Sequence, residues 1–334
     1  MSEARDASVA PHNHERYVLI RPGALGDALL TFPALTLLRG QRPGAHVTLI
    51  ARGDILSLAR ASGLADATSA FDDPIWYALF DTLPRGETAY DVIEGAAVVA
   101  WLGDAEGTVR RALERLGANE IVLAESRPAE GSGVHAALHL ARALAPLGIT
   151  VPVTVNELAR VLPSFTAPEA DEAAADAAWQ SLVVPSDARV VALHAGSGGA
   201  AKRWPPQSFA AVADGLRSAG YWPLLIEGLQ DDMVTAAVIA AVGGEAPAVA
   251  RGLSIGALVS LLRRCVAYLG NDSGVTHLAA LAGGPVVAIF GPSDPALWSP
   301  LGPRVTALRS ANREMAGITV DEALAAVLAV ASTG

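Results

Sequence analysis

Short apolar runs alternate with longer amphipathic segments along almost the whole chain. Residues 17–20, 190–193 and 286–290 are short apolar runs rich in Val, Leu and Ile. Runs of this length and composition are typical of strands that are buried on both faces. Amphipathic segments with helical spacing follow most of them. Because strands and helices alternate in this way, the pattern predicts an α/β fold built from parallel sheets with helices on both faces.

The pattern predicts one strand–helix series in each half of the chain. In the first half, we expect strands at 17–20, 46–50, 90–93 and 121–123, and helices at 25–38, 108–116 and 135–147. In the second half, we expect strands at 190–193, 224–226, 248–249, 265–269 and 286–290, and helices at 169–182, 205–216, 231–242, 255–262, 274–281 and 320–330. Helix starts are indicated by Ser254, a preferred N-cap residue, and by Thr319 with Glu322, which have the spacing of a capping box.

The length of 334 residues predicts two domains, because single cores rarely grow this large. Prolines and weak periodicity over 150–168 indicate a linker. We therefore expect two Rossmann-like domains that face a cleft. The predicted boundaries are a disordered leader at 1–16, an N-terminal domain at 17–165, a C-terminal domain at 166–318 and a terminal helix at 319–334. We expect that helix to cross back onto the N-terminal domain, with a dimer contact as the alternative.

Charge and composition exclude several classes of protein. The net charge of −10 argues against a general nucleic-acid-binding protein and gives no broad basic face for an anionic membrane. The N-terminus is polar and lacks a signal-peptide core, and no apolar run is long enough to span a membrane. The single cysteine, Cys265, lies in an apolar run and is expected to be a buried hydrophobe rather than a nucleophile. We expect a cytoplasmic protein with at most peripheral contact with the inner face of the cytoplasmic membrane.

The first candidate motif is RPGALGD at 21–27, directly after the first predicted strand. It matches neither the glycine pattern of dinucleotide-binding proteins nor the P-loop, so sites of those two types are not expected here. Asp27 falls in the first turn of the following helix. Its carboxylate could simply complement the helix dipole, or it could be a general base that removes a proton from an acceptor hydroxyl. The residues alone leave both interpretations open.

The second motif contains the only lysine of the chain. Lys202 follows the small residues of HAGSGGAA at 194–201 and precedes a pair of prolines that favours a helix start. A lysine presents a compact charge that suits a phosphate oxygen, and small residues let the backbone approach an anion. A composition rich in arginine could also have left one lysine by chance. The neighbouring residues favour a phosphate site.

The third motif is GNDSGVTH at 270–277, between a predicted buried strand and a helix. Asp272 and Ser273 occupy cap positions, so the N–H groups of the first helical turn point outward and favour an anion. His277 lies about one turn further along. Singly, these residues are more often a plain cap and a core histidine, whereas together they indicate one face of a ligand site. A fourth motif, FGPSDP at 290–295, predicts a tight turn that shapes the same pocket.

These four motifs, in this order and spacing, resemble those of glycosyltransferase family 9, the ADP-heptose:lipopolysaccharide heptosyltransferases. The resemblance implies a GT-B fold and an inverting, metal-independent transfer of heptose or a related sugar from an ADP-sugar, which is a co-substrate, so no cofactor is expected. By position, Asp27 matches the catalytic base. The resemblance assigns the donor diphosphate to Lys202, Ser197, Gly198, Ser273 and Gly274, the donor sugar to Asp272 and His277, and the nucleoside pocket to Leu253 and Asp231. No metal site is expected, because the sequence has neither a D-x-D element nor a cluster with metal-ligand spacing.

The acceptor is expected on the N-terminal domain, as lipopolysaccharide core or a related glycan. Candidate acceptor contacts are Arg21, Arg52, Arg60, His135, His139 and Arg142. The segment around His135 is mostly apolar, whereas inner-core enzymes of this family are expected to carry more arginine there. Two alternatives therefore stay open: a GT-B transferase with another nucleotide sugar and a small-molecule acceptor, and a non-catalytic nucleotide-sugar-binding protein. The presence of Asp27, Lys202 and Asp272 together favours catalysis.

Overall fold

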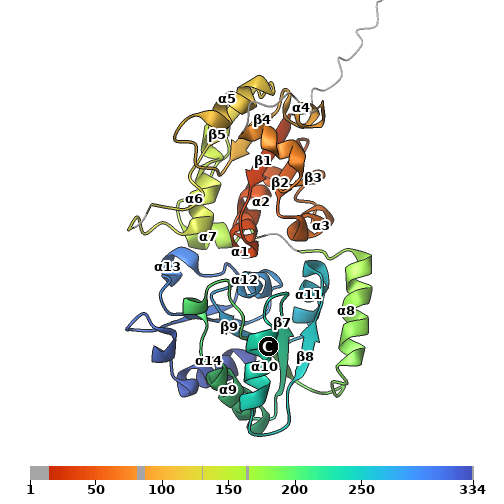
Figure 1. The fold of residues 1–334 in the computed structure, drawn as a ribbon, viewed down its shortest axis with the longest axis vertical. Coiled ribbons are helices and arrows are strands. Elements are labelled where there is room, and N and C mark those ends of the chain that lie inside the picture. The colour runs from red at the N-terminus through yellow and green to blue at the C-terminus, as the bar shows by residue number, and fades with distance from the viewer. Residues whose placement is uncertain (1–14, 81–86, 130, 163–164, 333–334) are drawn as a thin grey trace, which may run out of the picture.

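The computed structural model describes residues 15–80, 87–129, 131–162 and 165–332, which form two α/β halves (Figure 1). The first half contains a parallel sheet of order β3-β2-β1-β4-β5, and the second a parallel sheet of order β11-β10-β9-β6-β7-β8. The strands of the first sheet are β1 Arg16–Arg21, β2 His46–Ala51, β3 Ala67–Ala70, β4 Ala97–Ala100 and β5 Glu120–Leu123. Those of the second are β6 Val190–His194, β7 Trp222–Glu227, β8 Ala248–Arg251, β9 Ala267–Asn271, β10 Val286–Phe290 and β11 Val305–Arg309.

Helices connect the strands and cover both sheets. In the first half they are α1 Leu25–Leu29, α2 Phe32–Gln41, α3 Gly53–Ala61, α4 Glu87–Ile93, α5 Thr108–Arg115, α6 Ala136–Arg142 and α7 Val155–Ala159. In the second half they are α8 Glu169–Ser181, α9 Pro206–Ser218, α10 Asp232–Ala241, α11 Ile255–Leu262, α12 Gly274–Leu281, α13 Pro295–Trp298 and α14 Val320–Ala331. Short 3-10 helices are η1 Pro74–Leu79, η2 Ala145–Leu147, η3 Ala200–Lys202 and η4 Met315–Gly317.

The central strands β6, β9 and β10 are buried along their whole length, as strands covered by helices on both faces must be. The predicted α/β class with parallel sheets is thus confirmed. The predicted caps are also present: Ser254 accepts a hydrogen bond from the Ala257 N–H, and Thr319 forms a capping box with Glu322.

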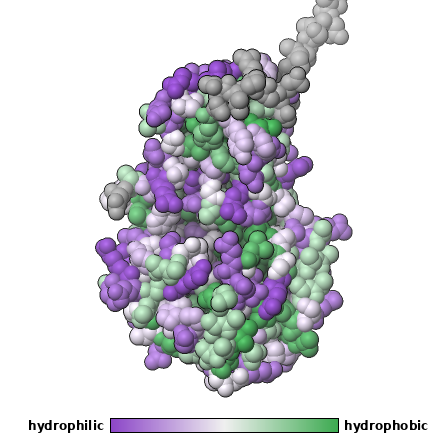
Figure 2. All heavy atoms as spheres, in the orientation of Figure 1, coloured by the Kyte–Doolittle hydropathy of each residue, from purple (hydrophilic) through white to green (hydrophobic). Residues whose placement is uncertain are grey.

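The two halves meet along a boundary with much polar surface (Figure 2). The carboxyl ends of β1, β6 and β9 lie toward it, and α1 packs against α12 across it. The rings of Phe32 and Phe165 stack with centroids 5.5 Å apart, so apolar packing also reaches the segment that joins the halves. This arrangement brings the loop after β1 opposite the loops after β6 and β9.

The prediction of a strand at 90–93 is wrong. These residues belong to α4, and the strand that pairs with β1 is β4, a few residues later. Ala89 and Ile93 are both buried at helical spacing, whereas Asp91 between them is exposed. The β-forming residue types Tyr, Val and Ile thus occupy a helix because their spacing buries one helical face.

The single helix predicted over 25–38 is two helices, α1 and α2. The break falls at Leu30 and Thr31, and Pro33 occupies the first turn of α2, where its missing N–H costs no helical hydrogen bond. Strands β3 and β11 and helix α3 were not predicted. The predicted linker contains α7, and its residues 163–164 lie outside the described part of the chain, as do residues 1–14 of the predicted leader.

The terminal helix does not cross back onto the N-terminal domain as expected. Helix α14 packs on α9, β9 and β10 of the second half. Its buried residues Ala323, Val327 and Ala331 share one apolar cluster with Leu269 of β9 and Val287 of β10. The apolar face that the sequence indicated is therefore used to cover the second sheet.

Candidate active site

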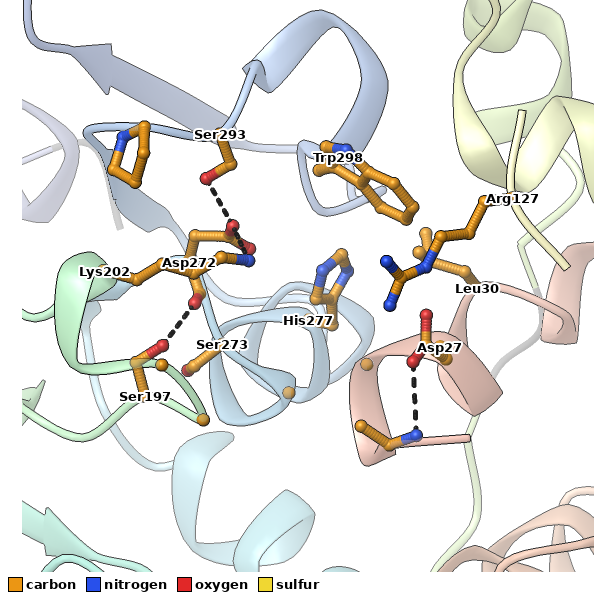
Figure 3. A pocket seen from close by; sticks show the side chains of 16 residues that line it. Asp27, Leu30, Arg127, Ser197, Lys202, Asp272, Ser273, His277, Ser293 and Trp298 are labelled. Carbon is orange, nitrogen blue, oxygen red and sulfur yellow. Dashed lines mark hydrogen bonds and ion pairs between the residues drawn. The ribbon is translucent and has the colours of Figure 1, made fainter. Parts of the chain in front are cut away.

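A cavity of about 610 Å³ lies between the two halves and is lined by both of them (Figure 3). Its lining residues on the first half are Ala24, Gly26, Asp27, Leu30 and Arg127. On the second half they are Ser197, Gly198, Gly199, Lys202, Asp272, Ser273, Gly274, His277, Pro292, Ser293 and Trp298. All four motifs singled out in the sequence contribute to this one cavity.

Asp27 enters the cavity from the first turn of α1, with one-fifth of its side chain exposed. Its Oδ2 accepts a hydrogen bond from the backbone N–H of Ala24 at 3.2 Å, which closes the first turn of the helix. Its Oδ1 lies 3.4 Å from the guanidinium of Arg21, which is buried. The Asp27 carboxylate thus caps the helix and also lines the cavity, and its role as a general base stays a prediction.

Lys202 lies opposite, on η3, and its Nζ donates to Asp272 Oδ2 at 2.7 Å. The same oxygen accepts from Ser293 Oγ at 2.6 Å. Asp272 is buried, whereas the Lys202 side chain is 39% exposed. The ammonium group is therefore anchored by a buried carboxylate while part of it remains open to a ligand.

Two buried contacts fix the glycine-rich loop that carries Lys202. The Asn271 amide donates to the carbonyl of Ala195 at 2.8 Å and accepts from the N–H of Trp204 at 3.0 Å, so it holds both ends of the loop. The Ser197 hydroxyl donates to the backbone carbonyl of Asp272 at 2.9 Å. The motifs at 194–205 and 270–277 therefore form one unit. Asn271 stands within the quoted motif, but its role in holding the loop was not foreseen from the sequence.

The N-terminus of α12 points into the cavity and touches α1 of the other half. Ser273 is the N-cap and accepts from the N–H of Thr276. A Cβ on Gly274 would lie 2.8 Å from the Cβ of Leu25, and one on Gly26 would lie 3.2 Å from the His277 ring. Only glycine allows the two helix starts to approach this closely. This helix start lines the cavity together with Lys202, and the N–H groups of a first helical turn suit an anion.

His277 is buried at the inner wall of the cavity, between Asp272 and Asp27 (Figure 3). Burial lowers the pKa of His277 to about 4, although the carboxylates of Asp272 and Asp27 act in the opposite direction. The imidazole is therefore neutral at physiological pH and can exchange hydrogen bonds with a hydroxyl group without adding charge.

Arg127, Ser293 and Trp298 also line the cavity and were not predicted as site residues. Arg127 follows β5 on the first half, and its Cζ lies 5.9 Å from the ring centre of Trp298, which ends α13 on the second half. In Figure 3 its guanidinium points into the space between Asp27, His277 and the indole. Arg127 comes from the first half and the other two from the second, and only Ser293 lies within the tight turn at 290–295 that the sequence indicated.

The candidate acceptor residues have different positions. Arg21 lines a second cavity of about 260 Å³ that it shares with Asp27 and Arg127. His135 is buried, and its Nε2 lies 2.8 Å from the carbonyl of Ser299 on the other half, so this histidine joins the two halves. Burial lowers the pKa of His135. The other candidates line neither cavity, and their role as acceptor contacts stays a prediction; they are Arg52, Arg60, His139 and Arg142.

The two candidates for the nucleoside pocket lie outside the lining of the main cavity. Leu253 is half-buried and packs on the large apolar cluster. The Asp231 carboxylate is bound within the protein, because its Oδ2 accepts from His194 Nε2 at 3.0 Å and from the Gly228 N–H at 3.1 Å. The expectation that Asp231 faces a ribose is therefore not supported by the orientation of its carboxylate.

Within the described part of the chain, no three His, Cys, Asp or Glu side chains are grouped so that they could hold a metal ion. None of the helices described here combines the length and the apolar content needed to cross a membrane. Cys265 is buried, as predicted, and burial raises the pKa of its thiol to about 12.

The fold and the cavity together define a class of two-domain α/β protein with a ligand site between its domains. The sequence profile of "Glycosyltransferase family 9 (heptosyltransferase)" matches residues 90–325, which is more than half of the chain. The chain therefore belongs to glycosyltransferase family 9, as the sequence motifs indicated.

Individual relatives agree with this assignment. A segment of 115 residues is 35% identical to "Lipopolysaccharide heptosyltransferase 2" of Salmonella typhimurium, and the match covers 33% of each chain. The matched part is thus about a third of the length of that curated relative.

Solved structures resemble the chain over nearly its whole length. A glycosyltransferase family 9 protein from Veillonella parvula superposes with a TM-score of 0.77 at 20% identity, covering 96% of this chain and 98% of that one. The Escherichia coli ADP-heptose lipopolysaccharide heptosyltransferase II gives a TM-score of 0.70 at 18% identity, covering 95% and 99%. The predicted GT-B fold is thereby confirmed.

Proposed function

We propose that this protein transfers a heptose, or a related sugar, from an ADP-sugar to a hydroxyl group of a glycan acceptor of the lipopolysaccharide-core type. The observation that carries the proposal is the single cavity in which Asp27 of one half faces Lys202 and the α12 N-terminus of the other. Membership of family 9 and the likeness to an ADP-heptose heptosyltransferase support this donor and this class of acceptor. The reaction would take place at the inner face of the cytoplasmic membrane, where a lipid-linked acceptor is reached by peripheral contact.

In the proposed reaction, the acceptor oxygen attacks the anomeric carbon of the donor from the face opposite the diphosphate. The bond between the anomeric carbon and the diphosphate oxygen breaks, so ADP leaves and the configuration is inverted. The proton of the acceptor hydroxyl passes to the Asp27 carboxylate. A positioned base of this kind contributes roughly 10²–10⁴-fold to a rate.

The leaving diphosphate gains negative charge as the bond breaks. In the proposal, the Lys202 ammonium and the N–H groups at the start of α12 stabilise this charge, so the step is carried out without a metal ion. Asp272 would keep Lys202 in place through their 2.7 Å hydrogen bond, which leaves further N–H donors of the ammonium for phosphate oxygens. The neutral His277, between the two acidic groups, would bind hydroxyl groups of the sugar.

Donor preference tests the first part of the proposal. Melting temperatures are measured with ADP-heptose, UDP-glucose and GDP-mannose, because a ligand that binds only the folded state stabilises it. We expect a clear rise with ADP-heptose alone. A rise with the UDP- or GDP-sugar instead would favour a GT-B transferase with another donor.

Turnover tests the second part. Purified protein is incubated with ADP-heptose and a lipopolysaccharide core acceptor in the presence and absence of EDTA, and ADP release and the anomeric configuration of the product are measured. We expect acceptor-dependent ADP release that resists EDTA and a product of inverted configuration. Binding of ADP-heptose without any release of ADP, across core acceptors, would favour the non-catalytic alternative, and loss of activity in EDTA would refute metal independence.

A further inference from the structure

A chain of polar side chains lies directly behind the cavity wall and is not used by the reaction described above. His194, the last residue of β6, is buried, and its two ring nitrogens have different partners. Nε2 lies 3.0 Å from Asp231 Oδ2, and Nδ1 lies 3.3 Å from the hydroxyl of Ser273. Ser273 is itself a lining residue of the cavity and the N-cap of α12.

The partners of these groups indicate where their protons lie. The hydrogen bond from His194 lowers the pKa of Asp231, so Asp231 is an ionised carboxylate that can only accept. His194 Nε2 must then carry a proton, which in the neutral imidazole leaves Nδ1 as an acceptor. The Ser273 hydroxyl is the group placed to donate to it.

The next hydroxyl groups agree with this assignment. Thr276 Oγ1 donates its proton to the carbonyl of Asn271, because a carbonyl can only accept. In the hydrogen bond of 3.0 Å between Thr276 Oγ1 and the Tyr268 hydroxyl, the tyrosine is therefore the donor. Thr276 then needs no proton from Ser273, which lies 3.1 Å away. Each hydroxyl proton has an acceptor when Ser273 donates to His194, so Asp231 sets the orientation of a hydroxyl group that it does not touch.

We propose that Asp231 and His194 are positioning residues that act through Ser273, whose hydroxyl donates to His194 and so holds the first turn of α12 in the orientation in which its N–H groups bind the diphosphate of the nucleotide. This inference rests on the proposed function for the identity of the ligand. It gives Asp231 a different role from contact with a ribose. It also accounts for the buried histidine that opens the glycine-rich motif.

The test uses the affinity of the full-length protein for ADP, measured by calorimetry. Asp231→Ala removes the acceptor of the Nε2 proton, which frees the imidazole to adopt the other tautomer and turns the Ser273 hydroxyl away from its present partner. We expect Asp231→Ala and Ser273→Ala each to weaken ADP binding about tenfold, because the first turn of α12 loses the orientation in which its N–H groups donate to the charged ligand. Asp231→Asn is expected to stay within about threefold, because its carbonyl oxygen can still accept from Gly228 and His194.

The double variant separates positioning from general support of the fold. In the Ser273→Ala background, Asp231→Ala should change the ADP affinity less than twofold, whereas in a Ser273→Thr background, which keeps the hydroxyl, it should again weaken binding about tenfold. Asp232→Ala, an exposed acid in the next position, is the matched control and should bind ADP like the wild type. Melting temperatures of all variants verify that they are folded.

An Asp231→Ala effect that persists in full without the Ser273 hydroxyl would overturn the inference, since Asp231 would then act through the loop at 195–199 instead. Wild-type protein that binds ADP but transfers no sugar would refute the proposed function while still deciding the role of Asp231. Wild-type protein that does not bind ADP would overturn both.

Discussion

A substitution of Gly274 tests whether sugar transfer requires the close contact between α1 of the first half and α12 of the second. A Cβ at this position would lie 2.8 Å from Leu25 Cβ, 2.9 Å from Leu25 Cγ and 3.0 Å from the Gly26 nitrogen. Two of these neighbours are backbone or Cβ atoms of α1, which cannot rotate away. Overpacking of this kind costs about 1–3 kcal/mol, and here the cost falls on the contact between α1 and α12. Since about 1.4 kcal/mol is a factor of ten, Gly274→Ala should lower kcat/KM for sugar transfer roughly 5- to 150-fold.

The assay compares kcat/KM, ADP affinity and melting temperature of Gly274→Ala with those of Gly40→Ala. Gly40 lies on α2, and a Cβ there would meet no atom within 4 Å, so this control should transfer sugar at the wild-type rate. The added methyl of Gly274→Ala points at Leu25 of the other half, so we expect ADP affinity to fall less than kcat/KM does. Wild-type transfer by Gly274→Ala would refute the reasoning, because the halves could then react without approaching this closely.

Three further predictions concern single side chains. Lys202→Ala should lower kcat about 100-fold or more in a folded protein, because the leaving diphosphate loses its cation. Lys202→Arg can still pair with Asp272, so its kcat should fall less. Near-normal turnover of Lys202→Ala would show that the lysine is incidental. Arg127→Ala should lower kcat/KM for the acceptor about tenfold and leave ADP affinity unchanged, because Arg127 lies on the first half, where the acceptor is expected to bind. An equal loss of ADP affinity would show that Arg127 contacts the donor instead. His277 stays neutral in the folded state down to about pH 4, whereas the unfolded chain binds its proton near pH 6.5, so the free energy of unfolding should fall as the pH is lowered between these values, by about 3 kcal/mol for this residue. Urea unfolding at pH 7 and pH 4.5 should show a smaller fall for His277→Gln, and an unchanged fall would assign the effect to other groups, such as His135, whose pKa burial also lowers.

The parts of the fold that the sequence predicts well are those where a local pattern meets no competing tertiary constraint. The apolar runs of β6 and β10 and the caps at Ser254 and Thr319 follow from residue type and spacing alone. Residues 90–93 show the opposite case. Their residue types favour a strand, but a helix forms because it buries Ala89 and Ile93 together on one helical face.

The candidate site divides in the same way. Asp27, Lys202 and Asp272 each lie within a short motif at the end of a strand, and parallel sheets bring such ends to one edge. Arg127, in the loop after β5, and Trp298, at the end of α13, lie in segments whose local sequence carries no such signal, and their approach to within 5.9 Å depends on how the two halves pack. The partners of Asp231 likewise depend on two separate strand ends, those of β6 and β7, so the sequence could not show that its carboxylate is turned toward His194.

The central claim is that a carboxylate on the first half takes the acceptor proton while the second half holds the diphosphate. The most direct measurement is single-turnover transfer from ADP-heptose by Asp27→Asn, which keeps the size of the side chain, with ADP affinity measured on the same sample. We expect transfer to slow at least 100-fold, the lower range for loss of a general base, with ADP affinity within about threefold of the wild type. Transfer at close to the wild-type rate would contradict the account, because the proton would then leave by a route that does not involve Asp27.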